Sequence, residues 1–276
     1  MLFRSRRKIA LVTDAFPHIV KGTGAEVGGA FTDAWESSPF SDEYLTALAM
    51  AAIDGLRLGR GEGTDMLAIS FSALDKVGHD FGPDAHETQD TLVRLDAQIG
   101  LLLDKLDRDV GKGNYVVGFT ADHGVAPVPE RLQAQGFAAG RISTTDVGKT
   151  IDAVLARELG AGSYNTKVIY NDVFFNEGVY SRLKQNQRAM DAVLGAVGSI
   201  PGIARVLRKE ELSAADPFTR ASALSHYEGR SGDVKFLSRP YWITSTSTTT
   251  HGTAHRYDTR VPLVLFGFGV KKGEDR

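Results

Sequence analysis

Four segments of strand length, separated by segments with helical periodicity, place the strongest limit on what this chain can fold into. They are Met66–Ser72, Tyr115–Thr120, Lys167–Phe175 and Arg260–Phe266. Apolar runs without alternation are typical of parallel strands buried on both faces. The third segment is rich in β-branched and aromatic residues, which also favours a strand. Pro262 in the fourth indicates a strand start or an edge strand.

Helical patterns lie around and between these segments. In Glu87–Leu106, apolar residues recur every three or four positions with charged residues opposite, which predicts the clearest helix. Asp42–Leu58 shows a similar apolar face, with Ser41 or Asp42 as a plausible N-cap. Weaker helices are expected at Thr150–Leu159 and Ser181–Val197. Helices that alternate with apolar strands predict an α/β protein with a mainly parallel sheet.

The composition narrows the class of protein. The formal net charge of the 276 residues is -2, so no basic excess indicates binding to nucleic acid or to an anionic membrane. No apolar run approaches the roughly 20 residues of a membrane span. The opening MLFRSRRKIALV has neither a full apolar region nor a small-residue cleavage site, and we do not predict a signal peptide there. The chain has no cysteine, so histidines and carboxylates would have to hold any metal ion.

Three short polar motifs lie beside the apolar segments. Asp75 and His79 follow the first segment, Asp122 and His123 follow the second, and His251 precedes the fourth. In open α/β sheets, ligands gather at the carboxyl ends of strands, and imidazole and carboxylate groups both bind zinc. Five such residues in three places predict two metal ions, which can clamp the attacking and leaving oxygens of a phosphoryl displacement.

Each motif alone has a simpler interpretation. Asp-x3-His pairs occur on helix surfaces, Asp-His-Gly can begin a polar loop, and a histidine near the Thr-rich segment 244–250 can simply be exposed. The joint occurrence of the motifs favours a metal site, because three independent explanations would otherwise have to hold together. Two neighbouring histidines are weaker candidates for ligands. His86 is expected to cap the long helix or face solvent, and His255 suits the third motif less well than His251 does.

The sequences around these residues resemble one family. FSALDKVGHDFGPDAHETQDTLVRLD, FTADHGVAPVPE and HGTAHRYDTRVPLVLFGFGVKKG are similar to the metal-binding segments of the alkaline phosphatase superfamily. The branch indicated is the phosphate-irrepressible alkaline phosphatases, related to type I phosphodiesterases and nucleotide pyrophosphatases. The resemblance implies a three-layer α/β/α sandwich with a mostly parallel sheet. We expect one incomplete domain over 1–276, in which 127–241 includes a smaller accessory region covering the site.

The resemblance also implies roles for the five residues. Asp75, His79 and His251 match the ligands of one zinc ion, and Asp122 and His123 match two ligands of a second. The implied activity is zinc-dependent hydrolysis of small phosphate monoesters through a covalent phospho-enzyme. Two alternatives stay open, namely a phosphodiesterase or nucleotide pyrophosphatase, and a catalytically silent metal-binding fragment. A periplasmic or secreted location is implied, and the sequence does not indicate an oligomeric state.

The chain departs from the family pattern at both ends. It shows no strand that ends in the family's first Asp and leads to the nucleophilic Thr or Ser, so we expect the nucleophile upstream and the chain alone to be inactive. It also stops before the last strand and helix of the pattern. A rival interpretation takes Asp14 as the missing ligand and Thr23 or Thr32 as the nucleophile, although the neighbouring FPH favours an internal loop. Thr120 is expected to support packing or to orient a ligand.

Overall fold

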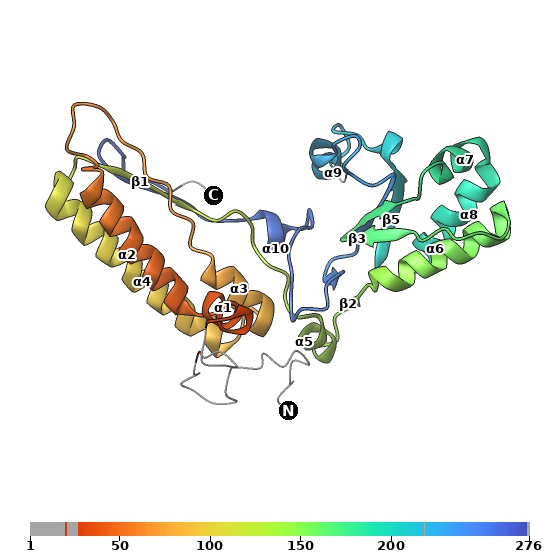
Figure 1. Cartoon of the computed structure of the whole chain (residues 1–276), viewed down its shortest axis with the longest axis horizontal. Helices are drawn as coiled ribbons and strands as arrows, with labels where there is room; N and C mark the ends of the chain where they lie inside the picture. Colours follow the sequence, from red (N-terminus) through yellow and green to blue (C-terminus); the bar gives the residue numbers. More distant parts are fainter. Residues whose placement is uncertain (1–19, 21–26, 218, 275–276) are drawn as a thin grey trace. The chain divides into compact units, whose positions relative to one another are not determined.

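The computed structural model describes residues 20, 27–217 and 219–274 of the chain (Figure 1). These residues divide into two compact units. The first unit runs up to Asp122 and resumes at Val261, and the second unit is His123–Arg260. The predicted accessory region, 127–241, falls inside the second unit. That this region covers a site stays a prediction.

The first unit is mainly helical. Its helices are α1 (Gly29–Glu36), α2 (Pro39–Gly55), α3 (Ala73–Phe81) and α4 (His86–Leu106), and a π-helical turn η1 (Asp107–Gly111) follows α4. The long helices α2 and α4 pack side by side (Figure 1). Both were predicted, but α2 begins at Pro39 with Ser38 as its N-cap. Proline is favoured at the first helical position, and the expectation of Ser41 or Asp42 as the N-cap was wrong.

Two strands of the first unit form an antiparallel ribbon. β1 (Val116–Thr120) pairs with β8 (Leu263–Gly267), with Val116 opposite Gly267 and Thr120 opposite Leu263. Both strands were predicted, and Pro262 directly precedes β8. Their apolar side chains are largely in solvent: Leu263 is 71% exposed and Phe266 is 48% exposed.

The expected buried strand at Met66–Ser72 was wrong. This segment has no strand structure, and Met66 is 89% exposed. A strand needs a neighbour to satisfy its backbone hydrogen bonds, and none of the described residues pairs with this segment.

The second unit combines a four-stranded sheet with helices. The sheet is antiparallel in the order β3 (Lys167–Ile169), β4 (Asp172–Phe174), β6 (Val234–Ser238), β5 (Ile203–Arg208). β2 (Gly140–Arg141) and β7 (Trp242–Ile243) form a separate, parallel pair. The helices are α5 (Pro129–Ala134), α6 (Thr144–Leu159), α7 (Val179–Gln185), α8 (Gln187–Gly198), α9 (Arg220–Ser225) and α10 (Arg256–Thr259), with a 3-10 turn η2 (Lys209–Glu211).

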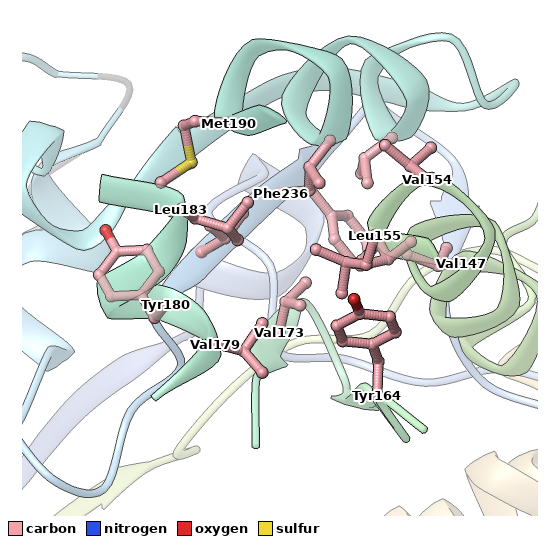
Figure 2. Close-up of a cluster of buried hydrophobic side chains, with 14 of the residues drawn as sticks. Val147, Val154, Leu155, Tyr164, Val173, Val179, Tyr180, Leu183, Met190 and Phe236 are labelled. Carbon is pink, nitrogen blue, oxygen red and sulfur yellow. The ribbon is translucent and has the colours of Figure 1, made fainter. Parts of the chain in front are cut away.

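A well-packed core holds the second unit together. α6 and α8 pack on each other, α6 also contacts β3, and α8 also contacts β5. Figure 2 shows buried side chains of this core, among them Leu155 of α6, Val173 of β4 and Phe236 of β6. Complete burial of one such side chain stabilises the folded state by about 1.5–3 kcal/mol.

Three predicted elements of this unit differ in detail. Lys167–Phe175 is a hairpin rather than one strand, because the chain turns at Tyr170, whose φ is +54°, beside polar residues that favour turns. Ser181–Val197 is two helices, separated at Asn186, whose side chain accepts from the Ala189 N–H and caps α8. The helix predicted at Thr150 begins earlier, at Thr144, because Ser143 caps it. Among the helices of the part described, none combines the length and apolarity that crossing a bilayer requires.

Candidate metal-binding site

Helix α3 presents the first predicted ligand pair. Asp75 and His79 are four residues apart on one face of the helix, with Oδ1 and Nε2 separated by 3.3 Å. Both side chains are partly exposed. One carboxylate and one imidazole therefore lie within reach of a common partner, as the Asp-x3-His spacing predicts.

The start of α3 is held by a residue from another helix. The Ser72 side chain makes no capping bond, and Oδ1 of the buried Asp42 in α2 instead accepts from the Ala73 N–H at 3.3 Å. Burial raises the pKa of the Asp42 carboxyl, an effect that the N–H groups of Ala73 and Ser72 partly offset. At the other end, Gly82 has a φ of +94° and closes the helix onto the Gly78 carbonyl. α3 is thus fixed at both ends.

The second motif depends on a close approach of backbone to backbone. The Gly124 N–H donates to the Asp258 carbonyl at 2.7 Å, and a Cβ on Gly124 would lie 2.1 Å from the Tyr257 carbonyl oxygen. Only glycine fits there. His123 Nδ1 lies 2.8 Å from the Gly124 carbonyl oxygen. When Nδ1 carries the proton and donates to this carbonyl, Nε2 keeps its lone pair. This tautomer leaves Nε2 able to bind a metal ion.

The third motif joins the second inside the same unit. The His251 ring stacks on the His123 ring, with centroids 3.4 Å apart and planes 11° from parallel. Two hydrogen bonds to the Ala126 backbone hold the two segments together, since the Ala126 N–H donates to the Thr250 carbonyl and the Thr249 hydroxyl donates to the Ala126 carbonyl. Two predicted ligands that are 128 positions apart in sequence are therefore neighbours.

The five predicted ligands divide between the two units. Asp75, His79 and Asp122 belong to the first unit, and His123 and His251 belong to the second. The structure brings two pairs of predicted ligands together, each pair within one unit. Asp75 lies beside His79, and His123 lies beside His251. That the first two share an ion with His251 stays a prediction.

The weaker candidates have structural roles. His86 is the exposed first residue of α4, as predicted. His255 Nε2 lies 3.0 Å from the Ser238 carbonyl oxygen, and His255 is the N-cap of α10. The Thr120 hydroxyl donates to the Pro262 carbonyl at 2.9 Å and so links β1 to the start of β8. Thr32 lies within α1, whereas Asp14 and Thr23 lie outside the described residues.

Sequence reasoning missed three polar residues that support the predicted ligands. Asp42 was interpreted only as a cap of its own helix. Arg141 is a single charged residue in the short strand β2, and its role is argued below. Asp258 is buried and accepts from the backbone N–H and the hydroxyl of Thr253, at 2.7 and 2.5 Å. It fixes the turn that follows His251. A lone charge in an otherwise small or apolar segment is the signal that could have found Arg141.

A pocket of about 330 Å³ adjoins His251 within the second unit. Its walls include the aromatic rings of Tyr170 and Trp242 and the polar side chains of Ser238 and Thr253. Lys235 also lines it, but its Nζ donates to Asp172 Oδ2 at 2.6 Å, so its charge is balanced by a carboxylate. The pocket therefore offers aromatic surface and hydroxyl groups with little net charge of its own.

Comparison with known proteins places the chain in a family. The family model described as type I phosphodiesterase / nucleotide pyrophosphatase matches residues 13–258. The chain belongs to this family. Proteins similar to this chain include alkaline phosphatase PafA of Elizabethkingia meningoseptica, 32% identical over 86% of this chain and 44% of PafA. Another is alkaline phosphatase PhoV of Synechococcus elongatus, 32% identical over 95% of this chain and 47% of PhoV.

A solved structure of one of these similar proteins has the same fold. The crystal structure of wild-type alkaline phosphatase PafA matches with a TM-score of 0.77 and 30% identity, covering 88% of this chain and 48% of that one. The predicted alkaline-phosphatase-like α/β class is thereby confirmed. Among the described strands only β2 and β7 pair in parallel, whereas the β1–β8 ribbon and the four-stranded sheet are antiparallel, so the expected predominance of parallel pairing is not seen in this part of the chain. The chain spans about half the length of the curated relatives it matches.

Proposed function

We propose that this chain forms the metal-binding part of a phosphate-ester hydrolase that uses two zinc ions. Asp75, His79 and His251 would hold one ion, and Asp122 and His123 would supply two ligands of the other. The observation that carries the proposal is the Asp75–His79 pair, 3.3 Å apart on α3, inside a family match that covers residues 13–258. The names of the relatives, alkaline phosphatases PafA and PhoV, support the same chemistry.

The chemistry of the donors fits zinc. Imidazole nitrogens and carboxylate oxygens are zinc ligands, although Mn²⁺ and Co²⁺ accept the same donors. When bound, two such ions would supply Lewis acidity and neutralise charge during phosphoryl transfer. The bond from His123 Nδ1 to the Gly124 carbonyl would keep Nε2 as the ligand nitrogen. The stacked rings of His123 and His251 would restrict each other's rotation and so keep both imidazoles oriented for metal binding.

Monoesters are the favoured substrates, with attack by a Thr or Ser through a covalent phospho-enzyme. The relatives named as alkaline phosphatases support this choice, whereas the description of the family model favours diesters as the second candidate. The pocket beside His251 would take the alcohol part of the ester, because 330 Å³ is at the lower end of ligand-pocket volumes. A periplasmic or secreted location belongs to the same proposal, and fractionation of the producing cells would test it.

Activity assays on two proteins test the function. The complete gene product and the 276-residue chain are each supplied with excess Zn²⁺ and assayed on an aryl phosphate and on an aryl phosphodiester. We expect the complete product to prefer the monoester, to contain about two zinc ions and to lose turnover when they are removed. Full activity with only magnesium or calcium present would contradict the zinc assignment. Preference for the diester would establish the second candidate instead, and metal binding without turnover in the complete product would indicate a silent module.

A further inference from the structure

Arg141, the last residue of β2, uses all the N–H groups of its side chain. Nε and Nη2 donate to the two carboxylate oxygens of Glu130, at 2.6 and 3.0 Å. Nη1 donates to the carbonyls of Ser245 and Ser247, at 2.8 and 2.6 Å, and Nη2 donates to the Thr248 carbonyl at 3.0 Å. A guanidinium has five N–H donors, so these five bonds account for all of them.

The three carbonyls belong to the loop that leads to His251. This loop, 244–250, consists only of Thr and Ser and connects β7 directly to His251. Three backbone carbonyls that converge on one point repel one another unless a cation lies between them. At its far end the loop is also held by Ala126, through Thr249 and Thr250. Arg141 therefore determines the path of a segment whose composition favours no regular structure.

Arg141 is itself held in place from two sides. Parallel pairing of β2 with β7 fixes its backbone, since the Ile142 N–H donates to the Ile243 carbonyl at 2.8 Å. Glu130, in the first turn of α5, fixes the plane of the guanidinium through the two bonds to its carboxylate. The Arg141 guanidinium in turn holds the pKa of the Glu130 carboxyl below its ordinary value, so the pair is ionised at neutral pH. Such two-pronged pairs are strong and set orientation.

We propose that Arg141 is a positioning residue for His251. By fixing the loop 244–250, it would place the His251 imidazole against His123 before any metal ion binds. Only the consequence for metal affinity rests on the proposed function. Lysine could not replace Arg141, because one ammonium group cannot reach a carboxylate and three carbonyls in a planar arrangement. If Arg141 merely stabilised the fold, its loss would lower stability without moving the His251 ring.

Histidine NMR on the metal-free, full 276-residue chain tests the proposal at a fixed pH. The His251 signal is assigned with His251→Gln, and then followed in Arg141→Met and Arg141→Lys. Arg182→Met is the matched control, because Arg182 also lies in the second unit but donates to a single carbonyl, that of Leu159. We expect the His251 signal to shift or broaden in both Arg141 variants and to stay unchanged in the control. The core methyl signals of Val147 and Leu155 show whether each variant is folded.

Co²⁺ titration of the same proteins gives the second measurement. We expect both Arg141 variants to bind Co²⁺ about tenfold or more weakly than the unmodified chain, within the 10–100-fold range for lost outer-shell partners. A folded Arg141→Lys chain with an unchanged His251 signal would overturn the proposal, even if Arg141→Met fails to fold. If the unmodified chain binds no metal, the proposed function fails, whereas the NMR comparison still decides the role of Arg141.

Discussion

The two units differ in how far the apolar side chains of their strands are buried. In the second unit, Phe236 in β6 is fully buried, and so are Val173 and Val234. In the first unit, Leu263 and Phe266 of β8 lie largely in solvent. Helices pack onto the four-stranded sheet, whereas a two-stranded ribbon alone is marginally stable. An apolar strand therefore shows that burial is possible, but whether it is buried depends on the layers that other segments supply.

The units also differ in how they carry the predicted ligands. Asp75 and His79 lie on a helix, whose own backbone bonds and the Asp42 carboxylate fix their spacing. His251 follows an irregular loop, whose shape depends on side-chain bonds from Arg141. Donors on a helix should thus tolerate the loss of one neighbouring residue better than a donor at the end of a loop.

The largest expected effect tests the contrast in burial. Phe236→Ala should lower the free energy of unfolding of the second unit by about 3–5 kcal/mol, because it leaves a cavity in a packed core. Phe266→Ala, in the exposed ribbon, should cost well under half of that. Urea denaturation followed by circular dichroism and by tryptophan fluorescence would measure both, since Trp35 lies in the first unit and Trp242 in the second. Equal losses would mean that the ribbon is covered in solution, and would break the comparison.

The next largest effect concerns the ligands themselves. His79→Ala on the helix and His251→Ala after the loop should each weaken Zn²⁺ binding by about 100-fold or more, since even the loss of an outer-shell partner costs about 10–100-fold. Competition with a chelating dye would measure the affinity. His86→Ala is the matched control, because His86 is exposed at the start of α4. A similar loss in the His86 variant would show that the ligands are assigned wrongly.

Much of the fold could be predicted where the pattern in the sequence is local. The face of α4, with apolar residues every three or four positions, identified that helix to within one residue. The breaks at Tyr170 and Asn186 were missed, because a strand-like or helix-like composition continues across each of them. Met66–Ser72 failed for a different reason. Its apolar composition is right for a strand, but pairing needs a partner that lies far away in sequence.

The candidate site could be predicted as residue types but not as an arrangement. The motifs named Asp75 and His79, and their spacing on a helix predicted their contact. The stacking of His123 on His251 could not be derived, because it depends on bonds between Ala126 and Thr250 across a long stretch of chain. The contribution of Arg141 was equally hidden, since its partners are backbone carbonyls, which have no signature in a sequence.

A smaller effect is expected from the loss of the Asp42 carboxylate, which holds the start of α3 in the first unit. Asp42→Ala should cost about 1 kcal/mol, the usual price of losing a helix cap, with Asp96→Ala on the exposed side of α4 as the control. Burial raises the pKa of Asp42 above its ordinary value of 3.8, so the folded state binds its proton more tightly than the unfolded state does. The contribution of Asp42 to stability is therefore greatest below pH 3.8 and falls as the pH rises through the raised pKa. Asp42→Asn should remove that slope in denaturation curves, and a slope that persists would exclude Asp42 as its source.

The smallest expected effect has the opposite sign and lies in the second unit. The Arg141 guanidinium holds the pKa of Glu130 below its ordinary value of 4.5. In the folded state Glu130 thus gives up its proton more readily than in the unfolded state, and its contribution to stability is present above pH 4.5 and is lost as pH falls through the lowered pKa. Partial exposure of the pair keeps this contribution modest.

Acidification should therefore weaken the Glu130–Arg141 pair and so loosen the loop 244–250. The stability contribution of Asp42, which holds the start of α3, should rise at the same time. Limited proteolysis at a series of pH values would show this as cleavage within the loop that increases below pH 4.5, when an acid-stable protease is used. In Glu130→Gln the cleavage should be raised at every pH and should no longer depend on this window, whereas Glu177→Gln, at an exposed position of the same unit, should behave as the unmodified chain does. Because acidification raises the stability contribution of Asp42 and lowers that of Glu130, one pH series distinguishes the two residues. If cleavage in the loop followed the Asp42 slope instead, the two units would unfold together and the contrast between them would be wrong.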